Sequence, residues 1–181
     1  MSLFASESVL EELSGRGALG PFSAAAVGPM ERFTPSEGCG FEMELVPVPH
    51  RDEHADTHAV AIRGPNRSVL FLPDHDDWNQ TLHRHGAVSI RQWLTDLKVD
   101  IALLDGSFWD ASELPGRDMS EIPHPPVSET LARLGERVEG DAEVYFIHLN
   151  HSNPLLGPGP QADELSDLGW GVAAQGQQFA L

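Results

Sequence analysis

The feature that most constrains the fold of this chain is a series of short strands that each end on a histidine or an aspartate. Between residues 46 and 78, an apolar strand ends at His50. Two more strands follow at residues 57–62 and 68–72, and the second of them ends at Asp74. Rigid strands pass into loops at such positions, and binding or catalytic side chains are commonly mounted there. His50 and Asp74 are therefore the first candidates for a functional site.

The second half of the chain repeats this pattern. A strand at residues 99–104 ends at Asp105, a strand at residues 144–147 ends at His148, and His124 lies in the loop between them. One such residue alone is more often a capping or turn residue, so the prediction rests on their joint recurrence. Two imidazoles and a carboxylate suit Zn²⁺ or a similar cation. Such a cation lowers the pKa of bound water to about 7 and polarises a phosphoryl or carbonyl oxygen.

Other local patterns compete with this interpretation. The spacing of His50, His54 and His58 would place all three on one face of a helix, where they could chelate a metal. The neighbouring prolines and the β-like residues that follow argue instead for a solvated loop, with one of these side chains near the site. The His-Arg-His string at residues 83–85 is expected in solvent. The acidic cluster at residues 74–77 lacks the Gly and Glu positions of a calcium-binding loop.

Composition narrows the class of protein. The net charge of −17, from 28 acidic and 11 basic residues, repels a phosphate backbone, so nucleic acid is a poor partner. A hydrophobic content of 40% and a length of 181 residues fit one folded domain, or part of a larger one. Cys39 is the only cysteine, which excludes an internal disulfide and a thiolate zinc cluster. Without an apolar run that could span a bilayer or a signal-peptide pattern, the expected location is cytoplasmic.

The pattern of elements predicts an α/β fold with a mixed sheet. Helices are expected at residues 6–15, after a capping box that begins at Ser89, and from about Ser128. The last of these helices is expected to bury Val127, Leu131, Leu134 and Val138. A further strand is expected at residues 41–45, mostly loop at residues 17–40, and a polar loop at residues 74–88. The tail at residues 157–181 is Gly/Pro-rich at first and ends in two short apolar runs around Val172 and Phe179.

Five strings together carry a family resemblance: VPVPHRDE, LFLPDHDDW, ALLDGSFW, ELPGRDMSEIPHPPV and FIHLNHSNPLL. From about Phe41 onward, the chain resembles the metallo-β-lactamase-fold hydrolases, in particular the branch that includes pyrroloquinoline quinone biosynthesis protein B. The resemblance implies an αββα sandwich with a metal site at the edge of the sheet. It implies that His50, Asp74 and His148 are metal ligands, with Asp74 able to bridge two metals.

The same resemblance implies roles for three further residues. Asp105 and His124 match the acid and the histidine that assist proton transfer in related phosphodiesterases and tRNA-processing enzymes. His151 is a possible additional ligand, although biosynthesis protein B tends to have Asn at that position, which favours His148.

One departure from the family is large. The signature HxHxDH, which supplies most ligands of the first metal, does not occur in this sequence. The chain therefore resembles a C-terminal portion of the fold, a single partial domain at residues 1–181. Its core is expected at residues 41–181, and a poorly defined helix and loop at residues 1–40. Strands that should pair with the missing half would leave an exposed edge or apolar face, so self-association or a covering partner is expected.

Three functions follow from these expectations. The first is a metal-dependent hydrolase of an ester or phosphodiester-type substrate that uses zinc, in a two-metal site that would be incomplete in this chain. The second is a non-catalytic remnant or binding module of the same fold. The third is an oxidative enzyme related to pyrroloquinoline quinone biosynthesis, in which iron replaces zinc.

Overall fold

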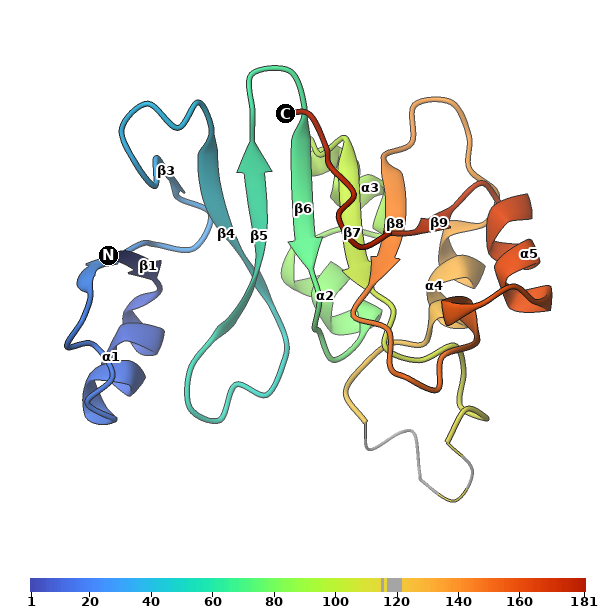
Figure 1. The fold of residues 1–181 in the computed structure, drawn as a ribbon, viewed down its shortest axis with the longest axis horizontal. Helices are drawn as coiled ribbons and strands as arrows, with labels where there is room; N and C mark the ends of the chain where they lie inside the picture. Colours follow the sequence, from blue (N-terminus) through green and yellow to red (C-terminus); the bar gives the residue numbers. More distant parts are fainter. Residues whose placement is uncertain (115, 117–121) are drawn as a thin grey trace.

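The computed structural model describes residues 1–114, 116 and 122–181. Within them, a mixed sheet of seven strands has the order β3-β4-β5-β6-β7-β8-β9 (Figure 1). The strands are β3 (Arg32–Phe33), β4 (Glu42–Val48), β5 (Thr57–Arg63), β6 (Ser68–Leu72), β7 (Ile101–Asp105), β8 (Glu143–Ile147) and β9 (Gly171–Val172). The pairs from β3 to β6 are antiparallel, and the pairs from β6 to β9 are parallel. The predicted α/β class with a mixed sheet is confirmed.

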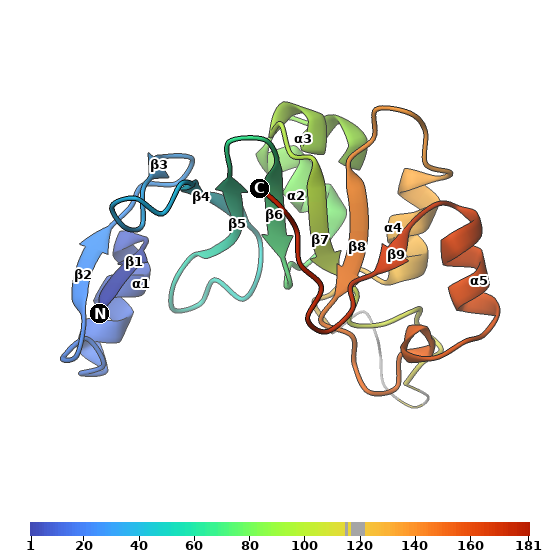
Figure 2. The ribbon, with the colours of Figure 1, turned by 45° about the horizontal axis from the view of Figure 1, so that its top comes forward.

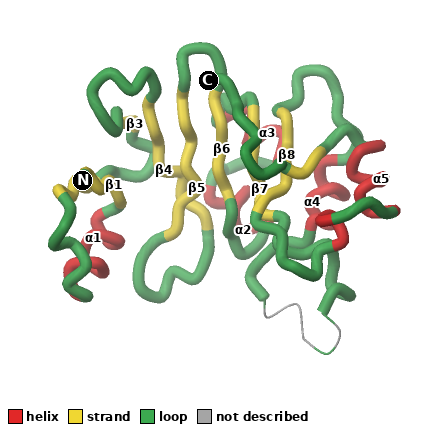
Figure 3. Tube along the Cα trace, in the orientation of Figure 1, coloured by secondary structure: helices red, strands yellow, loops and turns green. Residues whose placement is uncertain are grey.

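Helical crossovers connect the parallel strands, as parallel pairing requires. They are α2 (Trp78–Arg84), α3 (Ile90–Asp96), α4 (Val127–Leu134), the 3₁₀ helix η2 (Pro154–Leu156) and α5 (Pro160–Asp167). The carboxyl ends of β6, β7 and β8 consequently lie at one edge of the sheet. Because β4 and β6 are both antiparallel to β5, β4 ends at this edge as well. Figure 3 shows the loops after these four strands gathered along that edge.

Helices α2, α3 and α4 pack on one side of the sheet, which we call the inner face (Figure 2). Alternate strand residues point to this face because successive side chains of a strand point to opposite sides. Leu70, Leu72 and Leu104 are fully buried there against Trp78 and Trp93 of the helices. This cluster forms the core.

The opposite side, which we call the outer face, is also apolar. The pairing register joins Leu45, Val60, Phe71, Leu103 and Tyr145 into one row across five strands. Phe71 is 41% exposed. The C-terminal tail crosses this face in the ribbon views (Figures 1 and 2).

Two contacts hold the tail on the outer face. The ring of Phe179 lies 5.5 Å from the ring of Tyr145. The last residue, Leu181, lies against Gly64 in the turn between β5 and β6, where a Cβ would overlap the Leu181 backbone. Glycine is therefore required at this close approach. The tail therefore covers part of this face, while Leu45 at the other end of the row is buried next to Pro29.

The N-terminal part is more ordered than predicted. It forms a two-stranded parallel sheet of β1 (Ser2–Ala5) and β2 (Ser23–Ala26) with α1 (Glu7–Gly15) between them. Helix α1 lies within the predicted residues 6–15, and Ser6 caps it, since its hydroxyl accepts from the Val9 backbone N–H. Residues 17–40 are mostly loop, as predicted, apart from the short strands β2 and β3.

This N-terminal unit is joined to the large sheet at two points. The hydroxyls of Ser6 and Ser8 donate to the carboxylate of Asp56 in the loop between β4 and β5. The rings of Phe4 and Phe33 stack at 5.1 Å. No described helix is long and apolar enough to cross a membrane.

Two further local expectations fail for identifiable reasons. The segment 74–88 was expected to be a loop, but Asp77 caps α2, which buries Trp78, Thr81 and Leu82 on one face. Val138 is exposed rather than buried because α4 ends at Leu134, before Gly135 at φ 63°.

The tail at residues 157–181 contains α5 and β9 in addition to loop. His85 was expected in solvent, but it is half-buried, with Nε2 lying 2.8 Å from the Pro47 carbonyl oxygen.

Candidate metal centre

The strand ends bring the predicted site residues to one edge of the sheet. His50 follows β4, Asp74 follows β6, Asp105 is the last residue of β7, and His148 follows β8 directly. His148 has φ 60°, a left-handed conformation that is uncommon outside glycine. The surrounding loop therefore holds this histidine in a conformation it would not prefer alone.

Three of these side chains form a compact cluster. Asp74, His124 and His148 each offer a ligand atom, and the three atoms lie within 4.8 Å of one another. The Asp74 Oδ1 atom lies 3.8 Å from His124 Nδ1 and 3.6 Å from His148 Nδ1. The two rings are 5.8 Å apart between centroids. One carboxylate oxygen thus faces two imidazoles, a donor set that suits a borderline cation.

Asp105 lies behind the cluster and is buried. Its Oδ2 atom accepts a hydrogen bond from His124 Nδ1 at 2.7 Å, and its Oδ1 atom accepts one from the Ser107 hydroxyl at 2.7 Å. Burial of the His124 ring opposes its protonation. The hydrogen bond and negative charge of Asp105, together with the charge of Asp74, prevail, so the pKa of His124 is raised.

His50 lies beside the cluster rather than inside it. Its Nε2 atom is 3.9 Å from the same Asp74 Oδ1 atom, and its ring is 5.5 Å from the His124 ring. His50 Nδ1 and Asp76 Oδ1 lie 3.2 Å apart without hydrogen-bond alignment. Both atoms are buried and have no hydrogen-bond partner in the described part of the chain. Such buried polar atoms call for a partner that the protein itself does not supply.

The buried His75 was not singled out in the sequence. It has no exposed surface, its Nδ1 lies 2.9 Å from the Thr81 hydroxyl, and its Nε2 has no partner among the described residues. Burial lowers its pKa to about 4, although the charges of Asp105 and Asp77 partly oppose this shift. Its imidazole is therefore neutral near pH 7.

His151, the possible additional ligand, is exposed and lies outside the three-residue cluster, with Nδ1 3.1 Å from the Asn150 side-chain oxygen. It does share a pocket of about 280 Å³ with Ser107, His124 and His148. The pocket opens onto the cluster, so a small molecule that enters it meets both imidazoles.

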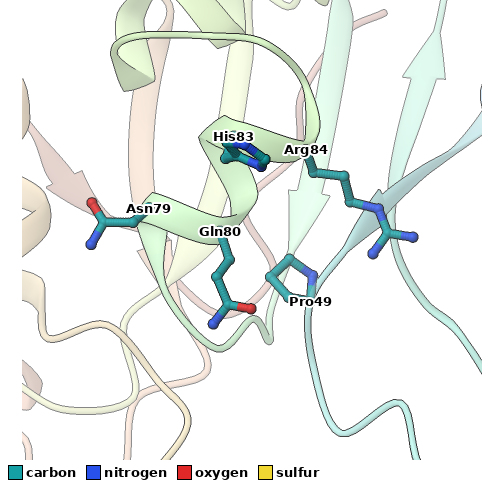
Figure 4. Close-up of a pocket in the computed structure, with 5 residues that line it drawn as sticks. All are labelled: Pro49, Asn79, Gln80, His83 and Arg84. Atoms are coloured by element: carbon teal, nitrogen blue, oxygen red, sulfur yellow. The ribbon is translucent and has the colours of Figure 1, made fainter.

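A larger pocket, of about 570 Å³, lies elsewhere on the surface. Figure 4 shows it along α2, lined by Pro49, Asn79, Gln80, His83 and Arg84. The side chains of Asn79 and Arg84 point in different directions, so the polar groups do not converge on one point. The smaller pocket, and not this one, is lined by residues of the three-residue cluster.

Ser107, His75 and Asp76 belong to the site neighbourhood but were missed in the sequence. A local signal existed for Ser107, since a serine two residues after a strand-ending aspartate can bond back to it. The Ser107 N–H does donate to Asp105 Oδ1, at 3.0 Å. His75 and Asp76 lie inside the acidic string after β6, where nothing in the sequence distinguishes them from solvated neighbours.

Comparison with known proteins identifies solved structures that share this fold. No family model and no curated protein matches the chain. Among solved structures, Zn²⁺-bound PqqB from Methylobacterium extorquens is 18% identical with a TM-score of 0.71, over 100% of this chain and 65% of that one. The metallo-β-lactamase fold protein YhfI from Bacillus subtilis is 13% identical with a TM-score of 0.60, over 95% of this chain and 61% of that one.

The metallo hydrolase Igni18 from Ignicoccus hospitalis is also 13% identical, with a TM-score of 0.57, over 94% of this chain and 63% of that one. The chain thus spans less than two thirds of the length of each of these proteins. The similarity shows that it has the metallo-β-lactamase fold, as the sequence resemblance implied.

Proposed function

We propose that this chain is a metal-dependent hydrolase of the metallo-β-lactamase superfamily that acts on an ester or phosphodiester. In this proposal Asp74, His124 and His148 hold zinc. The observation that carries the proposal is the convergence of these three residues, which are up to 74 positions apart, on ligand atoms within 4.8 Å of one another. The similar fold of PqqB, which was solved with Zn²⁺ bound, supports the choice of ion.

The residues present fit a metal ion. One carboxylate and two imidazoles are a common zinc ligand set. His50 Nε2 lies 3.9 Å from Asp74 Oδ1, where an additional nitrogen donor would be useful, while the buried His50 Nδ1 faces Asp76 Oδ1. We retain His50 as a further candidate ligand on this ground.

The protein groups around the cluster have separate roles in this proposal. When bound, the cation lowers the pKa of a coordinated water and polarises the oxygen of the substrate. Asp105 accepts a hydrogen bond from His124 Nδ1 and so orients the ring. The pocket shared by His124, His148 and His151 admits the substrate. The substrate is contacted there by loops that follow β7 and β8.

Two alternatives have specific support. The absence of an HxHxDH string from the given sequence favours a non-catalytic binding module. The resemblance of the sequence to the pyrroloquinoline quinone biosynthesis branch, together with the fold it shares with PqqB, supports the third function, an oxidative role for which iron would replace zinc. A cytoplasmic location and self-association, or a partner that covers the outer face, stay predictions.

Metal analysis of the purified chain separates these functions. We expect close to one zinc per chain in the wild type, and loss of most of it in Asp74→Ala and His148→Ala, measured by inductively coupled plasma mass spectrometry. His83→Ala, an exposed histidine on α2, is the matched control and should retain the metal. Iron in place of zinc would favour the oxidative enzyme. A chain that takes up no metal would overturn the hydrolase proposal in favour of the binding module.

Hydrolysis is tested on the same samples. Zinc-loaded wild type should cleave a chromogenic ester or phosphodiester, and Asp74→Ala should reduce the rate by at least about a hundredfold if the ion is required. Equal rates in both proteins would show that any activity comes from a contaminant or from another site.

A further inference from the structure

Ser107 lies at the centre of the cluster and is 4% exposed. Its hydroxyl oxygen lies 2.7 Å from Asp105 Oδ1, 3.0 Å from His148 Nδ1 and 3.3 Å from His124 Nδ1. One hydroxyl therefore contacts the buried carboxylate and both imidazoles. None of the roles assigned above to the candidate ligands accounts for it.

Counting protons gives the direction of each bond. An ionised carboxylate only accepts, and a serine hydroxyl has a single proton to donate. At 2.7 Å from Asp105 Oδ1, the hydroxyl must donate to that oxygen. It is then left with acceptor lone pairs only, so the 3.0 Å contact to His148 requires a proton on His148 Nδ1.

His124 is also protonated on Nδ1, but it bonds to Asp105 directly and not through Ser107. Its Nδ1 atom lies 2.7 Å from the second oxygen of Asp105, which also can only accept. His124 Nδ1 is therefore protonated as well. In both rings the free lone pair of the neutral imidazole is on Nε2.

We propose that Ser107 is a positioning residue whose hydroxyl links Asp105 to His148 by hydrogen bonds, an arrangement we call the relay. Through it and through the direct bond to His124, one buried carboxylate fixes both imidazoles as Nδ1–H tautomers. The consequence for a ligand, which rests on the proposed function, is that Nε2, and not the Nδ1 atom that lies nearest Asp74 Oδ1, is the nitrogen of each ring left free to bind a divalent cation. Hydrogen bonds that orient metal-ligating histidines through their other ring nitrogen act in this way.

The backbone around Ser107 holds the relay in place. The Ser107 N–H donates to Asp105 Oδ1, and the Ser107 carbonyl oxygen accepts from the Asn150 N–H at 3.0 Å. Gly106 donates to the Ile147 carbonyl oxygen at 2.9 Å, and a Cβ at Gly106 would lie 2.9 Å from Phe146 Cβ. The Ser107 loop is thus bonded to the segment that carries His148, which keeps hydroxyl and imidazole in register.

The tautomers can be read directly in the metal-free protein. Two-bond ¹H–¹⁵N correlation spectra of histidine side chains distinguish Nδ1–H from Nε2–H, at a pH high enough that the signals no longer change. His124→Gln and His148→Gln assign the two signals among the nine histidines. We expect both rings in the Nδ1–H form, opposite to the Nε2–H form that free imidazole side chains favour in water. An Nε2–H signal for His148 in the wild type overturns the proposal.

Variants then isolate the relay. In Ser107→Ala, His148 should change to the Nε2–H form, while His124, which Asp105 holds directly, should keep its Nδ1–H form as an internal control. Ser107→Thr should restore the wild-type spectrum because it keeps the hydroxyl. An unchanged His148 signal in a folded Ser107→Ala protein contradicts the proposal. If Ser107→Ala does not fold, the wild-type spectrum still tests the proposal. Ser107→Cys then replaces the alanine variant, and its thiol, a weaker donor and acceptor, should reduce the Nδ1–H form of His148.

A matched serine controls for general effects of the substitution. Ser112 bonds to Asp110 in the same local arrangement, with its N–H and hydroxyl 2.7 and 2.6 Å from Asp110 Oδ1, but it is exposed. Ser112→Ala should leave both histidine spectra unchanged. A His148 change in Ser112→Ala would show that the spectrum reports general disturbance rather than the relay.

Zinc affinity gives a second readout on the same variants. Competition with a zinc-binding dye should show binding about tenfold weaker in Ser107→Ala and near wild type in Ser107→Thr. Because the spectra are recorded without metal, an Nδ1–H result in a protein that binds no zinc would retain the relay and reject the hydrolase. A protein that binds zinc but shows His148 in the Nε2–H form would reject the relay and retain the proposed metal site.

Discussion

The two faces of the same sheet differ in how they are covered, although their sequences are similarly apolar. On the inner face, Leu70, Leu72 and Leu104 are fully buried beneath helices. On the outer face, Phe71 is 41% exposed, and the C-terminal tail contacts the row from Leu45 to Tyr145 at its Tyr145 end. Strands that are apolar on both sides are typical of sheets covered on both sides. Apolar residues on one face of a strand therefore do not by themselves show that this face is packed in the core.

The largest expected difference between the faces is in stability. Trp78→Ala should lower the free energy of unfolding by about 3–5 kcal/mol, because the ring is fully buried and its N–H bonds to Thr130 at 2.8 Å. Phe71→Ala on the outer face should cost less than about 1 kcal/mol, since 41% of that residue is already exposed. Urea unfolding measures both. Equal costs would mean that the outer face is covered in solution.

The second prediction concerns pH and the buried His75 beneath the inner-face helix α2. Its pKa of about 4 in the folded protein is below the value near 6.5 expected in the unfolded chain. As the pH falls below about 6.5, the unfolded chain binds this proton first, so stability is lost between about pH 6.5 and 4. The full contribution is about 3 kcal/mol.

This window is measured by urea unfolding at several pH values for the wild type and His75→Asn. The loss of stability between pH 6.5 and 4 should be smaller in the variant. Parallel pH profiles for the two proteins would show that His75 is protonated in the folded state or accessible to water.

Association through the outer face is the third expected effect. If a second copy covers the row around Phe71, Phe71→Asp should weaken self-association at least about tenfold, because it places a charge in an apolar contact. Val88→Asp is the matched control, since Val88 is 88% exposed and precedes α3 away from this row. Sedimentation velocity over a range of concentrations reports the association. A wild type that remains monomeric throughout contradicts self-association.

The smallest expected effect comes from the tail. Phe179→Ala should cost about 1 kcal/mol or less, because its ring contacts Tyr145 at 5.5 Å on a face that is otherwise open. A double-mutant cycle with Tyr145→Ala should give a coupling energy of about 0.5–1 kcal/mol. Zero coupling would indicate that the tail does not rest on the sheet in solution.

Periodicity and capping were sufficient for much of the fold. The strand at residues 68–72 was predicted at its observed bounds, and the Ser89 capping box begins α3, with the Ser89 hydroxyl accepting from the Gln92 N–H. Helix α2 was missed because its seven residues are mostly polar and only its contact with the core reveals the buried stripe. Short helices of this kind depend on tertiary packing more than on propensity.

The sequence by itself determined which residue types stand at the strand ends and that cysteine is not among the candidate ligands. Only the tertiary structure decided which of them meet, because strand direction and the helical crossovers bring residues distant in the chain to one edge. It placed His124 beside Asp74 and His148, left His151 outside the cluster, and put Ser107 between the two imidazoles. Hydrogen bonds act over about 3 Å, whereas sequence spacing fixes no distance between loops, so proton placement could be derived only from the folded chain.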